Sequence, residues 1–156
     1  MSDFGSLAEF GAHLLLAEIA AHKALEKGLD KAAAHIERAA KGKIGEYQAA
    51  NGMHDAWPEL ADSTKEDRVR KGFTENDPGL RRGDMRDSIS HETHGLEAAI
   101  GSDDQNLVWF ELGTDKQPPR SVLGAAAYES IDEVKKLVGG AVITGIVGGN
   151  SLDYKV

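Results

Sequence analysis

The longest regular pattern of apolar residues lies at the start of the chain and has the period of an α-helix. From Phe4 to Ala39, apolar residues recur at steps of three and four, with one larger gap around Gly28. Good helix formers, mainly Ala, Leu, Glu and Lys, fill the positions between them. The pattern predicts one long helix of about 40 residues, which Gly28 divides or kinks. Gly42 and Gly45 are expected to close it.

A second set of apolar residues widens the stripe on this helix. Leu15, Leu16 and Ile19 lie beside the main row and extend it sideways. The helix is therefore expected to cover its own sheet with one side and to meet a neighbouring subunit with the other.

The next segment alternates loops with one short helix. Residues 46–62 lack a helical or alternating pattern and are expected to form a loop. Ser63 and Glu66 have the spacing of a capping box, which predicts a helix that starts there and ends near Gly72. The Asn-Asp-Pro-Gly stretch at 76–79 is typical of a turn.

Short strands are expected from Met85 onward. Residues 88–90 and 96–100 flank a His-Gly pair and predict a β-hairpin. A polar loop follows, and the apolar run 107–112 is expected to return to the core as part of the same sheet region.

The C-terminal third predicts a helix and then a strand. Ser121 can cap a helix over 122–138, which Gly139-Gly140 would end. Residues 141–147 are rich in Val, Ile and Thr and predict either an edge strand or an arm that pairs with a neighbour.

Together these elements predict a single α+β domain with a long N-terminal helix, a small antiparallel sheet, and a C-terminal helix followed by a β-prone arm. The expected segments are the long helix (1–45), a loop and short helix (46–84), the sheet (85–120), a helix (121–138) and a glycine-rich arm (139–156).

Charge and composition narrow the functional classes. The net charge of −8 argues against binding nucleic acid by neutralising phosphates. Residues 65–86 differ, because seven basic and five acidic side chains give that segment +2 and leave −10 for the remainder. The simpler interpretation is a solvated helix and loop, and the alternative is a contact surface for an acidic partner.

The chain has no cysteine, which fits a reducing compartment and excludes disulfides. Acidic Asp3 and Glu9 stand where a secretory signal carries positive charge, and no apolar run approaches the ~20 residues of a membrane helix. A soluble protein made in the cytosol, without a membrane partner, is expected.

No group of residues predicts catalysis, a metal or a cofactor. His91 and His94 lie in the expected hairpin, where positions three apart point to opposite faces. Glu111 stands alone in an apolar run, so it should find a partner, and Arg120 is the nearest plausible one. We therefore expect a structural ion pair and a protein that is not an enzyme.

Two ordered blocks of residues resemble a known family. Trp109-Phe110-Glu111-Leu112-Gly113-Thr114, followed by Pro118-Pro119-Arg120-Ser121-Val122-Leu123, is similar to a signature of the tail-completion (head–tail joining, minor tail or neck) proteins of long-tailed bacteriophages. Trp57-Pro58-Glu59-Leu60 and the segment from Leu80 to Ile89 resemble the same family and phage virion-morphogenesis proteins. The positions that carry the likeness are Trp57, Leu80, Gly83, Ser88, Ile89, Trp109, Glu111, Gly113, Thr114, Pro119, Arg120 and Leu123.

The likeness covers roughly residues 44–128 and departs from the family pattern at three positions. Arg82 stands where Thr is usual, Met85 where Leu is common, and Val122 where an aromatic residue usually follows. The last difference is conservative for core packing, but it weakens the case for an aromatic anchor at this position.

The resemblance implies a small structural protein of the virion that forms a ring, typically a hexamer, at the head-proximal end of the tail or in the neck. Its partners would be other copies of itself, the tail tube protein and neck or connector proteins, with assembly in the bacterial cytoplasm. DNA would only pass through the lumen, where acidic walls would repel it.

Three other functions remain open. A head-side connector or stopper would have the same kind of ring. A small cytosolic binding or adaptor module could use the basic segment 65–86. A hydrolase that uses Glu111 or the His91/His94 pair is the least favoured.

Overall fold

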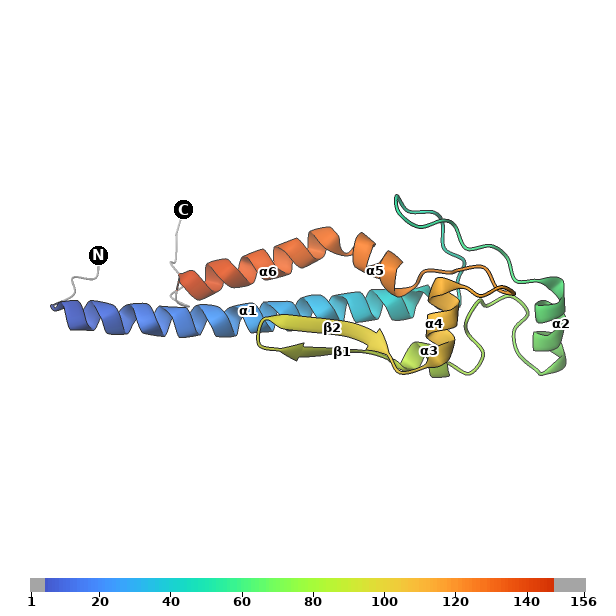
Figure 1. Cartoon of the computed structure of the whole chain (residues 1–156), viewed down its shortest axis with the longest axis horizontal. Helices are drawn as coiled ribbons and strands as arrows, with labels where there is room; N and C mark the ends of the chain where they lie inside the picture. The colour runs from blue at the N-terminus through green and yellow to red at the C-terminus, as the bar shows by residue number, and fades with distance from the viewer. Residues whose placement is uncertain (1–4, 148–156) are drawn as a thin grey trace, which may run out of the picture.

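The computed structural model describes residues 5–147, apart from the side chain of Ile146, and is organised along one long helix (Figure 1). Helix α1 spans Leu7–Lys43, 37 residues, and Ser6 caps it by accepting a hydrogen bond from the Glu9 amide. The helix passes through Gly28 without a break, so the predicted division there is wrong. Gly42 lies inside the helix, and the chain leaves it at Ile44 and Gly45, whose φ is +108°.

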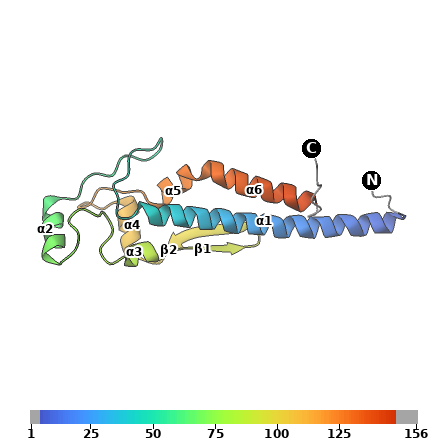
Figure 2. The ribbon, with the colours of Figure 1, turned by 180° about the vertical axis from the view of Figure 1, so that it is seen from behind.

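Helix α6 (Ile131–Ile146) packs antiparallel along α1, on the side away from the hairpin (Figures 1 and 2). Glycines allow a close approach at two points. A Cβ on Gly28 would lie 2.5 Å from the Ala141 Cβ, and one on Gly145 would lie 2.5 Å from the Ala21 Cα. Gly28 therefore serves helix packing and not helix termination.

The predicted end at Gly139-Gly140 and the strand over 141–147 are corrected by α6, which runs through both. Packing against α1 stabilises this helix, and tertiary contacts of this kind outweigh the local β-propensity of the segment. The remainder of the predicted arm, 148–156, lies outside the described residues.

The C-terminal helical region is two helices and not one. Helix α5 (Leu123–Glu129) ends at Ser130, which is buried, and α6 starts immediately after it. Ser121 contributes to the start of α5 because its Oγ accepts from the Ala125 amide at 3.1 Å, although the N-cap residue is Val122.

The predicted hairpin is confirmed. Strands β1 (Ile89–His94) and β2 (Glu97–Ser102) pair antiparallel, with Ile89 opposite Ser102 and a turn at Gly95. The hairpin lies against the side of α1 opposite α6 (Figure 1), so the long helix separates the two. One side of α1 therefore covers the sheet, as expected.

The apolar run 107–112 is helix α4 (Gln105–Leu112), not a strand. Asp104 caps it by accepting from the Asn106 amide at 2.9 Å, and Leu107 and Phe110, three positions apart, face the core. The predicted sheet region 85–120 therefore contains only the hairpin as sheet.

Two short helices complete the wide end of the molecule, which we call the head and define as residues 44–88 and 103–130. Helix α2 (Asp62–Arg70) starts after Ala61 without a side-chain cap, so the predicted capping box does not form, but its end near Gly72 is confirmed. Helix α3 (Asp84–Asp87) follows Gly83, which has a φ of +96°.

The hydrophobic core lies where the C-terminal part of α1 meets the head. Its buried members are Ala40, Ile44, Trp57, Met85, Ile89, Leu107, Phe110, Val122 and Ala126. The chain is thus α+β, as predicted, with helices dominant. Within residues 5–147, no helix has the length and apolar character needed to cross a membrane.

Candidate functional site in the head

Residues 109–124 form a tight reversal between α4 and α5, which we call the corner. Gly113 ends α4 with a φ of +76° and a ψ of 177°. Thr114 and Gln117 then exchange two backbone hydrogen bonds, at 2.8 and 3.2 Å. The Arg120 amide donates to the Phe110 carbonyl at 2.7 Å and so ties the returning chain to α4.

Glu111 caps helix α5 from outside that helix. Its carboxylate accepts hydrogen bonds from three backbone amides, of Val122 at 2.6 Å, Leu123 at 2.8 Å and Gly124 at 3.0 Å. The Ser121 hydroxyl donates a fourth, at 2.7 Å. Helix N-termini leave such amides without partners and favour a negative charge, so this carboxylate stabilises the start of α5.

Arg120 does not pair with Glu111, and the predicted ion pair is wrong. Its guanidinium donates instead to the Pro58 carbonyl, from Nε at 3.2 Å and from Nη2 at 2.8 Å, and to the Glu59 carbonyl at 3.1 Å. Burial lowers the pKa of Arg120. Arg120 thus links the loop after Trp57 to the corner by hydrogen bonds. Glu111 accepts hydrogen bonds from the backbone amides at the start of α5 instead of pairing with Arg120.

The other motif residues join the corner to the rest of the head. Trp57 is buried edge-to-face against Phe110, with ring centroids 5.3 Å apart, and its Nε1 donates to the Ser121 carbonyl at 3.2 Å. Ile89 is fully buried. The Ser88 hydroxyl lies 2.6 Å from the Ser102 hydroxyl and links the start of the hairpin to its end.

The structure therefore gathers the residues that carry the family resemblance into one packed unit. Leu80 and Leu123 pack against the core, Gly83 begins α3, and Gly113 lies too close to Pro119 to carry a side chain. Trp109, Thr114 and Pro119 are the exceptions, because all three are exposed, Trp109 by half of its surface.

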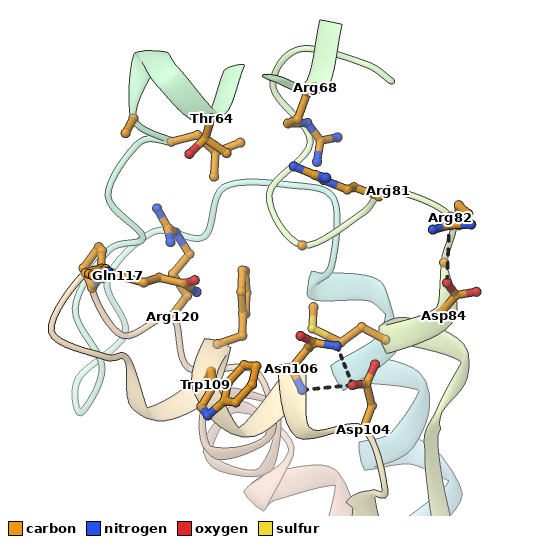
Figure 3. Close-up of a pocket in the computed structure, with 18 of the residues that line it drawn as sticks. Thr64, Arg68, Arg81, Arg82, Asp84, Asp104, Asn106, Trp109, Gln117 and Arg120 are labelled. Atoms are coloured by element: carbon orange, nitrogen blue, oxygen red, sulfur yellow. Dashed lines mark hydrogen bonds and ion pairs between the residues drawn. The ribbon is translucent and has the colours of Figure 1, made fainter. Parts of the chain in front are cut away.

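Trp109 faces a cavity of about 630 Å³ in the head. Helix α2, the loop 79–83, helix α4 and the returning segment 116–120 enclose it (Figure 3). In that view Arg68 and Arg81 lie at the upper end, Arg120 and Gln117 along one side, and Trp109 below these two. The sequence gives one indication of this cavity. Three of its lining residues, Arg68, Arg81 and Arg82, belong to the basic segment 65–86.

Part of that basic segment is neutralised within the head. Asp67 pairs with Arg70 at 2.6 Å, Lys71 at 2.9 Å and Arg81 at 3.0 Å. These bonds, above all the one from Lys71, hold the pKa of Asp67 well below its usual range.

The histidines of the hairpin do not converge on a site. His91 faces α1, where its Nδ1 lies 2.5 Å from the Glu37 carboxylate, whereas His94 is exposed and lies 3.6 Å from Glu92. The part of the chain that the structure describes holds no group of three or more His, Cys, Asp or Glu side chains able to bind a metal.

A second contact closes the head onto the long helix. The Lys43 ammonium lies 2.6 Å from the Glu129 carboxylate, which also accepts from Asn51 at 2.5 Å. The bond from Lys43 is the main reason that the pKa of Glu129 is lowered. This pair joins the end of α1 to the end of α5.

The lowered pKa of Glu129 predicts a pH-dependent stability. An unfolded Glu titrates near about 4.3, so the contribution of this pair is present above that pH and is lost as pH falls through the lower, folded pKa. Glu129 is partly exposed, so Glu129→Gln is expected to cost only about 1 kcal/mol at pH 7, with a difference that shrinks below about pH 4. Urea unfolding at several pH values would measure this difference in the free energy of unfolding.

The control is Glu133→Gln, which removes an exposed ion pair with Lys136 and should change stability little. An effect of Glu129→Gln that does not vary with pH would contradict the prediction.

Comparison of the chain with protein-family models, with curated proteins and with solved structures gave no match.

Proposed function

We propose that this protein is a structural component of a bacteriophage particle that forms a ring at the head-proximal end of the tail or in the neck. The observation that carries the proposal is the corner. Residues far apart in the sequence, from Trp57 to Leu123, resemble one family and build one packed unit. Glu111 and Arg120, the two charged residues of that resemblance, are occupied by hydrogen bonds that shape the backbone, which supports a structural and non-catalytic role.

The N-terminal part of α1 supports assembly with other copies. The helix extends beyond the end of α6 (Figures 1 and 2), and only Glu9, His13 and Glu18 are polar between positions 7 and 21. A helix that is apolar on nearly all sides is normally buried, because water disfavours such a surface. The large apolar side chains exposed there are Leu7, Phe10, Leu14, Leu15, Leu16 and Ile19.

Neighbouring subunits fit this surface better than a lipid surface does. Between positions 5 and 22 the chain carries no Lys or Arg, whereas helices that lie on anionic membranes are rich in both. In a closed ring, one patch of each subunit meets a different patch of the next, so a protruding helix can reach across the interface.

The proposed ring would bind the tail tube protein and neck or connector proteins on its two sides. The net charge of −8 supports a lumen that lets DNA pass without binding it. A head-side connector or stopper is the nearest alternative, since the same features suit it. The cavity lined by basic residues favours, as a second class, a small cytosolic binding module.

Electron microscopy of particles from a genome lacking this chain would test the proposal. We expect separated heads and tails, or tails of abnormal length, and particles of wild-type appearance would overturn it.

The same experiment can test the apolar end of α1 by complementation. The double substitution Leu15→Ser/Leu16→Ser is expected to leave the fold intact, because both side chains are exposed. It is expected to reduce the yield of joined particles roughly tenfold or more, since burial of apolar surface drives most protein–protein association. Leu96→Ser, an exposed apolar position in the hairpin turn, is the matched control. Equal yields from both variants would remove this end of α1 from the interface.

A further inference from the structure

We propose that the head cavity is a docking site for an acidic segment of a partner protein, whose carboxylates bind Arg68 and Arg120. This inference goes beyond the proposed ring, because the site would bind such a segment whether or not the chain assembles in a virion.

The two arginines are the most buried charged side chains of the cavity, with exposed fractions of 2% and 3%. Arg68 donates from Nε to the Thr74 carbonyl at 2.7 Å and from Nη2 to the Leu80 carbonyl at 2.7 Å. A longer bond of 3.3 Å joins Nη2 to the Thr74 hydroxyl. Arg120 likewise bonds only backbone carbonyls.

Every acceptor of these two guanidiniums is neutral. Among residues 5–147, neither Arg68 nor Arg120 lies within ion-pair distance of a carboxylate, although several exposed arginines do. A buried charge without a counter-charge is costly, and a bound carboxylate would offset that cost. The nearest compensation within the described residues is indirect. Asp77 bonds Thr74, which in turn bonds Arg68, and the Arg120 guanidinium lies 5.7 Å from the centroid of the Phe110 ring. Within the described part of the chain, neither guanidinium has a carboxylate in direct contact, and a ligand in the cavity would supply one.

One nitrogen of each guanidinium remains available to a ligand. The Nη1 atoms of Arg68 and Arg120 make no hydrogen bond within the described residues. Among the described residues, Asn51 Oδ1 is the side-chain polar atom that lacks both a hydrogen bond and contact with solvent. The two Nη1 atoms also lack a hydrogen bond but do not share that full burial, so each keeps some contact with solvent. Both residues line the cavity, so a ligand bound there would lie beside them.

The walls of the cavity carry a basic excess. Five basic side chains face three acidic ones, whereas the whole chain has a net charge of −8. The acidic ones already have partners. Asp104 accepts from Asn106, Glu59 lies 3.0 Å from Lys65, and Asp84 lies 4.0 Å from Arg82.

Two of the basic side chains in these walls also have partners, since Arg81 pairs with Asp67 and Arg82 with Asp84. Within the described residues, Arg68, Lys116 and Arg120 form no ion pair, so the excess rests on these three.

Trp109 adds an apolar surface to this basic site. Its side chain is half exposed and lies below Arg120 in the view of Figure 3, where both line the cavity. Trp and Arg are the residues that contribute most often to the binding energy of protein interfaces. A peptide with carboxylates beside an aromatic or aliphatic side chain would use both kinds of surface at once.

A nucleic acid fits the cavity less well than a peptide does. Phosphate backbones bind extended basic stripes, whereas this basic surface is confined to about 630 Å³ and includes three carboxylates. The size lies within the range of sites that enclose a ligand of a few side chains.

Nuclear magnetic resonance on the full ¹⁵N-labelled chain would test the site directly. The probe is the capped peptide Asp-Glu-Phe-Glu-Asp, compared with its neutral counterpart Asn-Gln-Phe-Gln-Asn, inorganic phosphate and a short oligothymidylate. We expect the acidic peptide to shift the side-chain Nε–H signals of Arg68 and Arg120 and the indole signal of Trp109. The neutral peptide should leave them unchanged, and raising the salt to about 1 M should weaken the acidic peptide strongly.

Variants of exposed residues avoid the risk that substituting a buried arginine unfolds the head. Arg82→Gln/Lys116→Gln removes two charges from the rim of the cavity, and Lys135→Gln/Lys136→Gln removes two from exposed positions on α6. The first pair is expected to weaken the acidic peptide roughly three- to tenfold, and the second to leave its affinity unchanged. The proposal is overturned if the acidic peptide does not bind at millimolar concentration, if both pairs act equally, or if phosphate or the oligonucleotide binds as tightly as the peptide.

Discussion

Replacing Glu111 by Ala is expected to lower the free energy of unfolding by about 3–5 kcal/mol, a large share of the stability of a chain of this size. The substitution leaves three amides at the start of α5 and the Ser121 hydroxyl without their common acceptor. Hydrogen bonds to a charged group contribute more than neutral ones, and the amide of Val122 belongs to a fully buried residue, where water cannot easily replace the carboxylate.

Equilibrium unfolding in urea, followed by circular dichroism, would measure the effect. Glu97→Ala, at an exposed position of β2, is the matched control and should change stability by less than about 0.5 kcal/mol. Glu111→Gln should fall between wild type and Ala, because its one carbonyl oxygen can still accept. A Glu111→Gln protein with full stability would show that the charge at α5 is dispensable, and one that lost only an enzymatic activity would favour the hydrolase.

The second large effect is expected for Gly113→Ala, at about 3–4 kcal/mol. With a φ of +76° and a ψ of 177°, Gly113 occupies a backbone region that is essentially restricted to glycine. Space is also lacking, because a Cβ would lie 2.7 Å from the Pro119 nitrogen and 2.9 Å from the Gln117 carbonyl oxygen. Both neighbours are backbone atoms, so the clash can be relieved only by opening the corner.

Thermal and urea unfolding of Gly113→Ala would test this, with Gly139→Ala as the control. Gly139 lies in α6, and a methyl group added there would meet nothing within 4 Å, so its replacement is expected to stabilise the helix by about 0.5–1 kcal/mol. Opposite signs for the two variants are the expected outcome. A Gly113→Ala protein as stable as wild type would mean that the corner can adopt another conformation.

Local patterns in the sequence were sufficient for the elements that depend on local interactions. The apolar period of α1 and the alternation and turn of the hairpin each reflect geometry within a few neighbouring residues. The same holds for the α+β class, because it follows from the order of those elements.

Patterns of the same kind failed where distant contacts decide the outcome. Residues 141–147 favour a strand by propensity, yet they are helical because Ala141 and Gly145 pack against α1. Residues 107–112 have the pattern of a core strand, since a short apolar run cannot be assigned by periodicity alone. The sequence of either segment alone does not show which surface of the protein it packs against.

The candidate site divides in the same way. The residue types and the order of the motif blocks are enough to mark Glu111, Gly113 and Arg120 as important positions. Their partners do not follow from spacing, because charge attraction favours Glu111 with Arg120, while the fold brings the free amides of α5 to the carboxylate and backbone carbonyls to the guanidinium.

The chain's own residues thus determine the long helix α1, the hairpin and the acidic character, since these depend on short-range sterics, periodicity and the count of charges. The placement of Glu111 at a helix start, of Arg68 and Arg120 beside one cavity, and of α6 along α1 arises only when segments separated by tens of residues pack together. Burial then decides which polar groups find partners and which face a cavity, and burial is a property of the folded chain.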